Sequence, residues 1–328
     1  MNWFKKHKSI FLVNFIVIFI ILAYTEYFLY VTSDRKYPLF FIANDINHPS
    51  MSEKYEDVDS APYDSLLNIL QDNVFKRPVG LNYTKTPVIL FGGSFAWGAK
   101  LQEEQTFHFK LSDIIKRPIY NRSISGWGVQ HMLYQLKQDS FYKKMPKPDY
   151  VIYMYIPNHI ARMHKYYFIK IHARTYCYNY LKYNEHFGKF YEEKRFQYLP
   201  YSRIWNGLIL PFMARMNEKN INKSFKLFEK HILECRREID NHWGKDVKFI
   251  IFDYEAAFND VKYDVLTKEN IEKLKQNRID VIKTSDISDI NPDAPQYTVD
   301  FLSHPNEDAW NVFTPLFTEK VRKTYPDF

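Results

Sequence analysis

The chain is short of the residues that mark several common protein classes. Its 328 residues hold only 9 glycines and 2 cysteines. So few glycines exclude a collagen-like repeat and argue against a long flexible linker. Cys177 and Cys235 can form one disulfide or remain two buried thiols, and their spacing does not decide between these states. No CxxC or HExxH pattern occurs, so the sequence carries no zinc signature.

Positive charge is not gathered into one block. The formal net charge of +7 is spread along the chain, and no DNA- or RNA-binding motif accompanies it. We therefore expect no nucleic-acid partner, and an anionic membrane surface or an acidic glycan suits the charge better. We interpret His159 and His164, which flank Arg162, as cleft or surface histidines rather than metal ligands. We expect neither a metal nor an organic cofactor.

A long apolar run lies near the N-terminus. Residues 10–31 are apolar apart from Asn14, Thr25 and Glu26, and three lysines precede them. As a helix rising about 1.5 Å per residue, this run reaches the roughly 30 Å needed to cross a bilayer. The preceding lysines predict that residues 1–9 are cytoplasmic and that everything after residue 31 lies outside. A cleaved signal peptide and a buried amphipathic helix are the alternatives. The run ends in bulky residues without a small-residue cleavage site, and no polar face recurs.

The rest of the chain divides at about residue 87. Residues 32–86 are polar, and we interpret them as a stalk that packs on the domain, with a short helix at 63–72. From residue 87 to 328, short apolar runs typical of buried strands alternate with segments whose apolar residues recur at helical spacing. The predicted strands are 88–91, 118–121, 150–156, 247–252 and 279–283, and the predicted helices are 106–115, 129–137, 221–242 and 307–325. This alternation predicts a flavodoxin-like three-layer α/β/α fold with a parallel sheet. Residues 160–220, rich in Tyr, Phe, His and Arg, are interpreted as an insertion over the carboxyl edge.

The first predicted strand of this domain ends in two glycines and a serine. Residues 88–91 are wholly apolar and are followed by Gly92-Gly93-Ser94. The apolar residues fill a buried parallel strand, and glycines allow a sharp turn without a Cβ clash. Ser94 is thereby predicted to lie at the carboxyl edge of the sheet, where open α/β folds place their sites.

Three later segments are predicted to reach the same edge. Residues 121–128 follow the second strand, residues 155–159 end the third, and residues 300–306 open the last helix with Pro305 in its first turn. Each has an ordinary structural explanation, such as a glycine turn or a helix cap. Their order, each at a strand end or a helix start, indicates a hydrolase site.

These segments together resemble the SGNH (GDSL-like) hydrolase superfamily over about residues 86–325. The segment 92–98 resembles the family's first block, and 121–128 its second, with Gly126 at the block's glycine. Asn158 matches the asparagine of the third block, and His304 the histidine of the fifth.

The sequence departs from the family pattern at three positions. Gly93 stands where the family usually has aspartate before the serine, and His159 where it has aspartate after the asparagine. Asp300 lies four residues before His304 instead of three. The resemblance then admits either a Ser-His-Asp triad or a Ser-His dyad whose imidazole is oriented by a backbone carbonyl.

The resemblance implies acyl transfer by a serine nucleophile. Ser94 would attack, His304 would take its proton, and Asp300 would orient the imidazole. The N–H groups of Ser94 and Gly126 and the amide of Asn158 would form the oxyanion hole. Membrane-anchored members of the family add or remove O-acetyl groups on envelope polysaccharides, which implies an acylated glycan substrate here. A lipid or thioester esterase and a non-catalytic glycan-binding or scaffold protein of an envelope assembly are the alternatives.

Overall fold

The computed structural model describes residues 17, 21, 77–124, 127–163, 180–184, 189–193, 221–256, 266–299 and 303–328. Within these ranges no helix is both long and apolar enough to cross a membrane. The predicted membrane helix at 10–31 lies outside them except for Val17 and Ile21, and the predicted helix at 63–72 lies outside them entirely.

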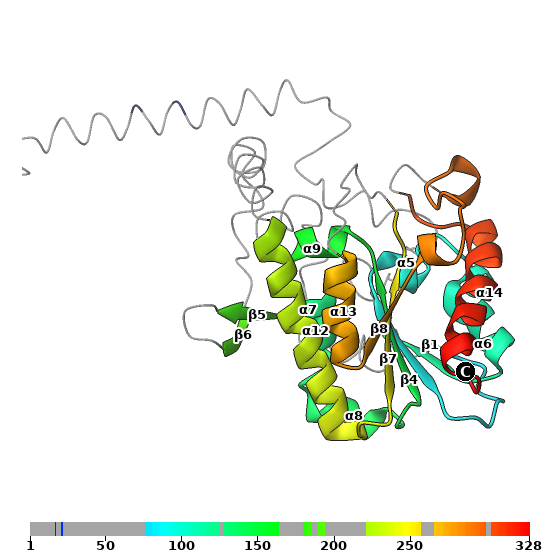
Figure 1. Cartoon of the computed structure of the whole chain (residues 1–328), viewed down its shortest axis with the longest axis horizontal. Coiled ribbons are helices and arrows are strands. Elements are labelled where there is room, and N and C mark those ends of the chain that lie inside the picture. The colour runs from blue at the N-terminus through cyan, green and yellow to red at the C-terminus, as the bar shows by residue number, and fades with distance from the viewer. Residues whose placement is uncertain are drawn as a thin grey trace, which may run out of the picture.

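A six-stranded sheet forms the centre of the described domain, in the order β1-β3-β2-β4-β7-β8 (Figure 1). Its strands are β1 (Arg77–Val79), β2 (Val88–Gly92), β3 (Ile119–Asn121), β4 (Tyr150–Tyr155), β7 (Lys248–Asp253) and β8 (Ile279–Lys283). The last five are parallel and, counted along the chain, stand in the doubly wound order 2-1-3-4-5 typical of flavodoxin-like folds. The predicted parallel α/β sheet is confirmed. However, the sheet is not wholly parallel, because the edge strand β1 pairs antiparallel with β3.

Helices cover both faces of the sheet and bury it. One face carries α7 (Val129–Leu136), α8 (Asp139–Lys144), α12 (Ile221–Trp243) and α13 (Lys268–Gln276), and the other carries α6 (Phe107–Ile115) and α14 (Glu307–Thr324) (Figure 1). Alternate residues of each central strand point to opposite cores. In β2, Ile89 and Phe91 join the first cluster, and Val88 and Leu90 join the second. Because both faces are covered, β2 and β4 are apolar or aromatic and buried along their whole length.

Several elements were not predicted. The hairpin of β5 (Tyr180–Asn184) and β6 (Lys189–Glu193) lies within the insertion, and β5 contacts α7 and α12 on one face of the sheet. Short 3₁₀ helices, η2 (Glu103–Gln105), η7 (Thr284–Asp286) and η8 (Pro295–Tyr297), occupy loops at the site described below. Cys235 is a buried free thiol whose pKa is raised by burial, and Cys177 lies outside the described residues.

Candidate active site

Ser94 is held at the carboxyl end of β2 by a tight strand-to-helix turn. It is the first residue of the short helix α5 (Ser94–Trp97), whose four residues are all buried. A Cβ on Gly92 would lie 2.7 Å from the Ala96 Cβ and 3.1 Å from the Met154 carbonyl oxygen. Glycine is therefore required where the strand passes under the helix. Gly98 ends α5 in the left-handed conformation (φ 81°) and donates to the Ser94 carbonyl oxygen.

His304 lies in the connection between η8 and α14, and backbone hydrogen bonds fix this connection. The Val299 N–H donates to the His304 carbonyl oxygen over 2.9 Å, and the Asn306 N–H donates to the Tyr297 carbonyl oxygen over 3.0 Å. Asn306 also caps α14 through its side-chain oxygen, which accepts from the Ala309 N–H. Pro305 therefore precedes the cap, and its predicted place in the first helical turn is wrong. The reason is that the Asn306 side chain forms the N-cap, so the helix begins at Glu307.

The fold brings Ser94 and His304 together across 210 residues of sequence. The His304 Nε2 lies 3.0 Å from the Ser94 Oγ, which is hydrogen-bonding distance. Both residues are buried, with 3% of Ser94 and 7% of His304 exposed. The centroids of the Phe95 ring and the His304 imidazole lie 5.2 Å apart, so Phe95 packs against one side of the base. A serine and a histidine in this relation can act as nucleophile and base.

Asn158 lies at the same edge of the sheet, where it follows the neighbouring strand β4. It is the first residue of α9 (Asn158–Arg162), three residues after β4, and it is fully buried. Strand β4 lies next to β2, with Met154 paired to Gly92. The predicted partners Asp300 and Gly126 lie outside the described residues.

His159 does not lie on the surface or in an open cleft as predicted. Its side chain is buried, and its Nδ1 lies 2.7 Å from the Tyr153 hydroxyl. Strand β4 and α9 turn the ring inward, so its contacts are those of a core histidine. His164 lies outside the described residues, and no group of three potential metal ligands occurs in the described part of the chain.

A partly buried polar cluster behind Ser94 was not predicted from the sequence. It contains Asn121 at the end of β3, His108 on α6 and Glu103 on η2. Asn121 also donates to the Ala96 carbonyl oxygen of α5. The sequence offered one signal for this cluster: His108 is a polar residue on the helix face that also carries the apolar Phe107 and Leu111, and this face of α6 is buried.

Two charged residues lie at the ends of elements that reach this sheet edge, Arg122 directly after β3 and Glu307 at the start of α14. Burial lowers the pKa of Arg122 to about 10, so its guanidinium stays protonated at neutral pH. Its Nε donates to the Gln135 side-chain oxygen over 3.0 Å. At the start of α14, hydrogen bonds from Lys110 and Gln105 hold the pKa of Glu307 below its usual range.

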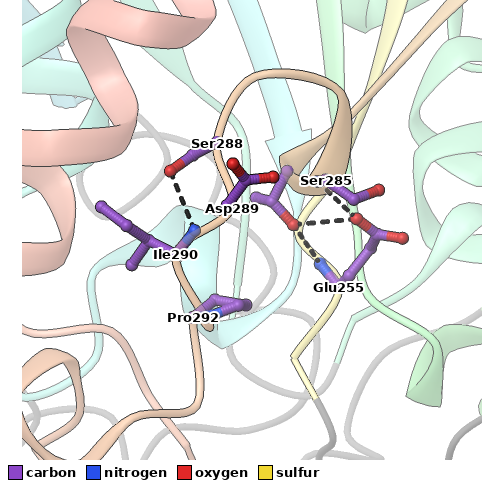
Figure 2. Close-up of a pocket in the computed structure, with 7 residues that line it drawn as sticks. Glu255, Ser285, Ser288, Asp289, Ile290 and Pro292 are labelled. Atoms are coloured by element: carbon purple, nitrogen blue, oxygen red, sulfur yellow. Dashed lines mark hydrogen bonds between the residues drawn. The ribbon is translucent and has the colours of Figure 1, made fainter.

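A small pocket with polar and apolar lining residues opens at the same sheet edge, beyond β7 and β8. Its volume is about 310 Å³, and Figure 2 shows the carboxylates and hydroxyls around it. The Glu255 carboxylate accepts from the Ser285 N–H over 2.7 Å and pairs with the Lys283 ammonium. Burial alone would raise the pKa of this carboxyl, but the hydrogen bonds from Ser285 and Lys283 outweigh burial, so its pKa lies below the usual value. The pocket is lined by Glu255, Thr284, Ser285, Ser288, Asp289, Ile290 and Pro292.

The solved structures that this chain resembles include esterases of the G-D-S-L family and carbohydrate esterases. A Desulfitobacterium hafniense protein assigned to the lipolytic G-D-S-L family has a TM-score of 0.43 and 11% identity, covering 72% of this chain and 99% of its own. A Pseudoalteromonas esterase has a TM-score of 0.41 and 12% identity, covering 74% of this chain and 100% of its own. An acetyl xylan esterase from Butyrivibrio proteoclasticus has a TM-score of 0.41 and 12% identity, covering 75% of this chain and 66% of its own.

No family model matches the sequence, and no curated protein matches it. With TM-scores this low, the three structures are resemblances only and decide neither fold nor activity. The fold rests on the strand order described above, and any activity rests on the residues at the sheet edge.

Proposed function

We propose that this chain is a serine-dependent acyl ester hydrolase or O-acyltransferase, with Ser94 as nucleophile and His304 as base. The observation that carries the proposal is the 3.0 Å distance between the His304 Nε2 and the Ser94 Oγ. A serine hydroxyl is a poor nucleophile until a base removes its proton. Two buried side chains from distant segments meet here at the carboxyl edge of a parallel sheet, where α/β folds place their sites.

The proposed reaction has two acyl-transfer steps. The Ser94 Oγ attacks the ester carbonyl while His304 takes its proton, and His304 then returns that proton to the departing alcohol oxygen as the C–O bond breaks. Water hydrolyses the acyl-enzyme, or a sugar hydroxyl accepts the acyl group. The Ser94 N–H, at the first position of α5, has no acceptor within the helix and suits a developing oxyanion. With the Gly126 N–H and the Asn158 amide, each donor would contribute about 3 kcal/mol. Asp300 would orient the imidazole.

The proposed substrate is an acylated glycan outside the cytoplasm, with the chain anchored by residues 10–31. The pocket at Glu255 supports a polyhydroxylated substrate, because carboxylates and hydroxyls accept hydrogen bonds from sugar hydroxyls. Three strand spacings of about 4.8 Å separate β2 from β8, so a substrate longer than one sugar ring could bridge Ser94 and this pocket.

The test of the chemistry uses the full-length chain purified in detergent. It should release p-nitrophenol from p-nitrophenyl acetate and be labelled by a fluorophosphonate, and Ser94→Ala should abolish both. Activity that persists in Ser94→Ala would overturn the assignment. A folded wild-type protein inert in both assays would favour a non-catalytic glycan-binding role instead.

The topology has a separate test. Alkaline phosphatase fused after Val31 should be active if the lysines ahead of the apolar run keep the N-terminus in the cytoplasm. An inactive fusion, with a cytoplasmic reporter active at the same position, would reverse the orientation and remove the basis for an external glycan substrate.

A further inference from the structure

Three hydrogen-bonded polar side chains lead from the partly exposed Glu103 to the buried Asn121 behind the Ser94 helix, and they are here named the Asn121 cluster (Asn121, His108 and Glu103). The Asn121 Nδ2 lies 2.8 Å from the Ala96 carbonyl oxygen and 3.0 Å from the His108 Nδ1. The opposite ring nitrogen, Nε2, lies 2.5 Å from the Glu103 Oε1. Asn121 and His108 are almost completely buried, so the two bonds made by the Asn121 Nδ2 form away from water.

The hydrogen bonds fix which way the Asn121 amide points. Its Oδ1 accepts from the Ser123 N–H over 3.0 Å, while both Nδ2 hydrogens are used by Ala96 and His108. A flipped amide would place an oxygen against the Ala96 carbonyl oxygen and an NH₂ group against the Ser123 N–H. Two repulsive contacts would replace two hydrogen bonds, so only the observed orientation is satisfied.

The same geometry fixes the proton on His108. Because the Asn121 Nδ2 can only donate, the His108 Nδ1 must accept and therefore carries no proton. The ring proton is on Nε2 and is donated to the Glu103 carboxylate. Glu103 is the outer end of the cluster, with 28% of its side chain exposed. The bonds therefore run in one direction: Asn121 donates to the Ala96 carbonyl oxygen of α5 and to the His108 Nδ1, and His108 donates from Nε2 to Glu103.

At its inner end the cluster bonds to two backbone segments, the helix α5 that begins with Ser94 and the segment that follows β3. The Ala96 carbonyl belongs to the last turn of α5 and has no acceptor role within that helix. A helix of four residues is unstable alone, so its position depends on such external contacts. The Ser123 N–H belongs to the segment that continues toward Gly126, the predicted oxyanion donor.

An apolar core would not need this arrangement. His108 lies on the buried face of α6 together with Phe107 and Leu111. A leucine at this position would fill similar space and would have no buried polar atoms that need hydrogen-bond partners. The clusters of apolar side chains on either face already stabilise the sheet. What the polar bonds add is direction, because a hydrogen bond fixes an angle and packing alone does not.

We propose that Asn121, His108 and Glu103 are positioning residues that hold Ser94 at hydrogen-bonding distance from His304. The inference rests on the proposed serine mechanism but is a separate claim about how the nucleophile is placed. A displacement of about 1 Å at the reacting atoms can cost about 10²-fold in rate.

The test is a matched series assayed with p-nitrophenyl acetate well below the melting temperature. His108→Leu leaves a buried Asn121 N–H unpaired, and kcat should fall by about 10-fold to 100-fold with little change in KM. His108→Asn returns a side-chain acceptor near the Nδ1 position and should recover most of kcat. The control is His231→Leu, which removes an equally buried histidine from α12 on the other face of the sheet. It should lower the melting temperature and leave kcat unchanged.

A milder pair covers the case in which His108→Leu does not fold. Glu103→Ala removes the acceptor for the His108 Nε2–H and should lower kcat several-fold, whereas Glu103→Gln keeps an acceptor oxygen and should resemble the wild type. Equal kcat in Glu103→Ala and Glu103→Gln, or in His108→Leu and His231→Leu, would overturn the inference. If Ser94→Ala also kept its activity, the proposed function itself would fail, so the two failures are distinguishable.

Discussion

The two halves of the candidate site are held in place by different kinds of interaction. Ser94 is fixed mainly by close packing, since its buried helix lies directly on a glycine of β2, and the Asn121 bond to the Ala96 carbonyl oxygen orients that helix. His304 is fixed by backbone hydrogen bonds within a connection, where Ser303 even adopts a left-handed conformation (φ 59°). The nucleophile is therefore part of the core, and the base is part of a braced loop.

This difference predicts how each half responds to mutation. Packing errors in a core spread to neighbours because no space is available to absorb them. Loss of one hydrogen bond in a loop with several others removes only part of the restraint. Changes on the Ser94 side should therefore alter stability and activity together, and changes around His304 should be graded.

The largest effect is expected from removing the base itself. His304→Ala should lower kcat for p-nitrophenyl acetate by about 10³-fold or more, equivalent to at least about 4 kcal/mol of barrier, because the Ser94 hydroxyl would lose its proton acceptor. Steady-state kinetics beside a thermal melt measure this loss. His242→Ala, at the far end of α12, is the control and should keep full activity. A comparable loss in both variants would mean that the effect is not local.

Gly92→Ala should give the next largest effect. The new Cβ would lie 2.7 Å from the Ala96 Cβ, so α5 must move or the core must expand. Overpacking of this kind typically costs about 1–3 kcal/mol of stability. A shift of Ser94 should lower kcat about 100-fold. Gly128→Ala is a milder comparison, because its Cβ would meet only the end of the flexible Gln130 side chain. Equal melting temperatures and rates for the two variants would contradict the packing argument.

Local apolar patterns explain which elements could be predicted from the sequence. The five parallel strands and the four helices predicted after residue 87 end within one residue of their observed bounds, because periodic apolar patterns are local signals. The three-residue β1 is too short to show a period. Helix α13 was missed because Leu274 is its one fully buried side chain, although Thr267 caps it and offered a signal.

The site was predictable only in part. Ser94 follows from the strand-to-glycine pattern, and its meeting with His304 was expected from the resemblance of four segments. The Asn121 cluster was not visible, since it depends on side chains from β3, α6 and η2 that meet only after folding. The buried place of His159 was missed for the same reason.

Asp300→Asn should cost less than His304→Ala. A firmly placed orienting carboxylate can be worth about 10⁴-fold, but Asp300 is one residue further from His304 than the family spacing. We expect a loss of about 10-fold, measured on the same acyl ester with folding checked by melting. Near-complete losses in both variants, each well folded, would show an intact triad and remove the dyad alternative.

The smallest effect should come from Asn306, whose two hydrogen bonds can be separated. Its Oδ1 caps α14 through the Ala309 N–H, and its Nδ2 donates to the Gln296 carbonyl oxygen over 2.7 Å, bracing the His304 connection. Asn306→Ala removes both bonds and should lower stability by about 1 kcal/mol and kcat a few-fold. Asn306→Asp keeps a capping carboxylate but loses the donor, so it should melt near the wild-type temperature and still show the few-fold loss of kcat. If Asn306→Asp instead had full activity, the cap alone would position His304, and the brace to Gln296 would have no part in catalysis.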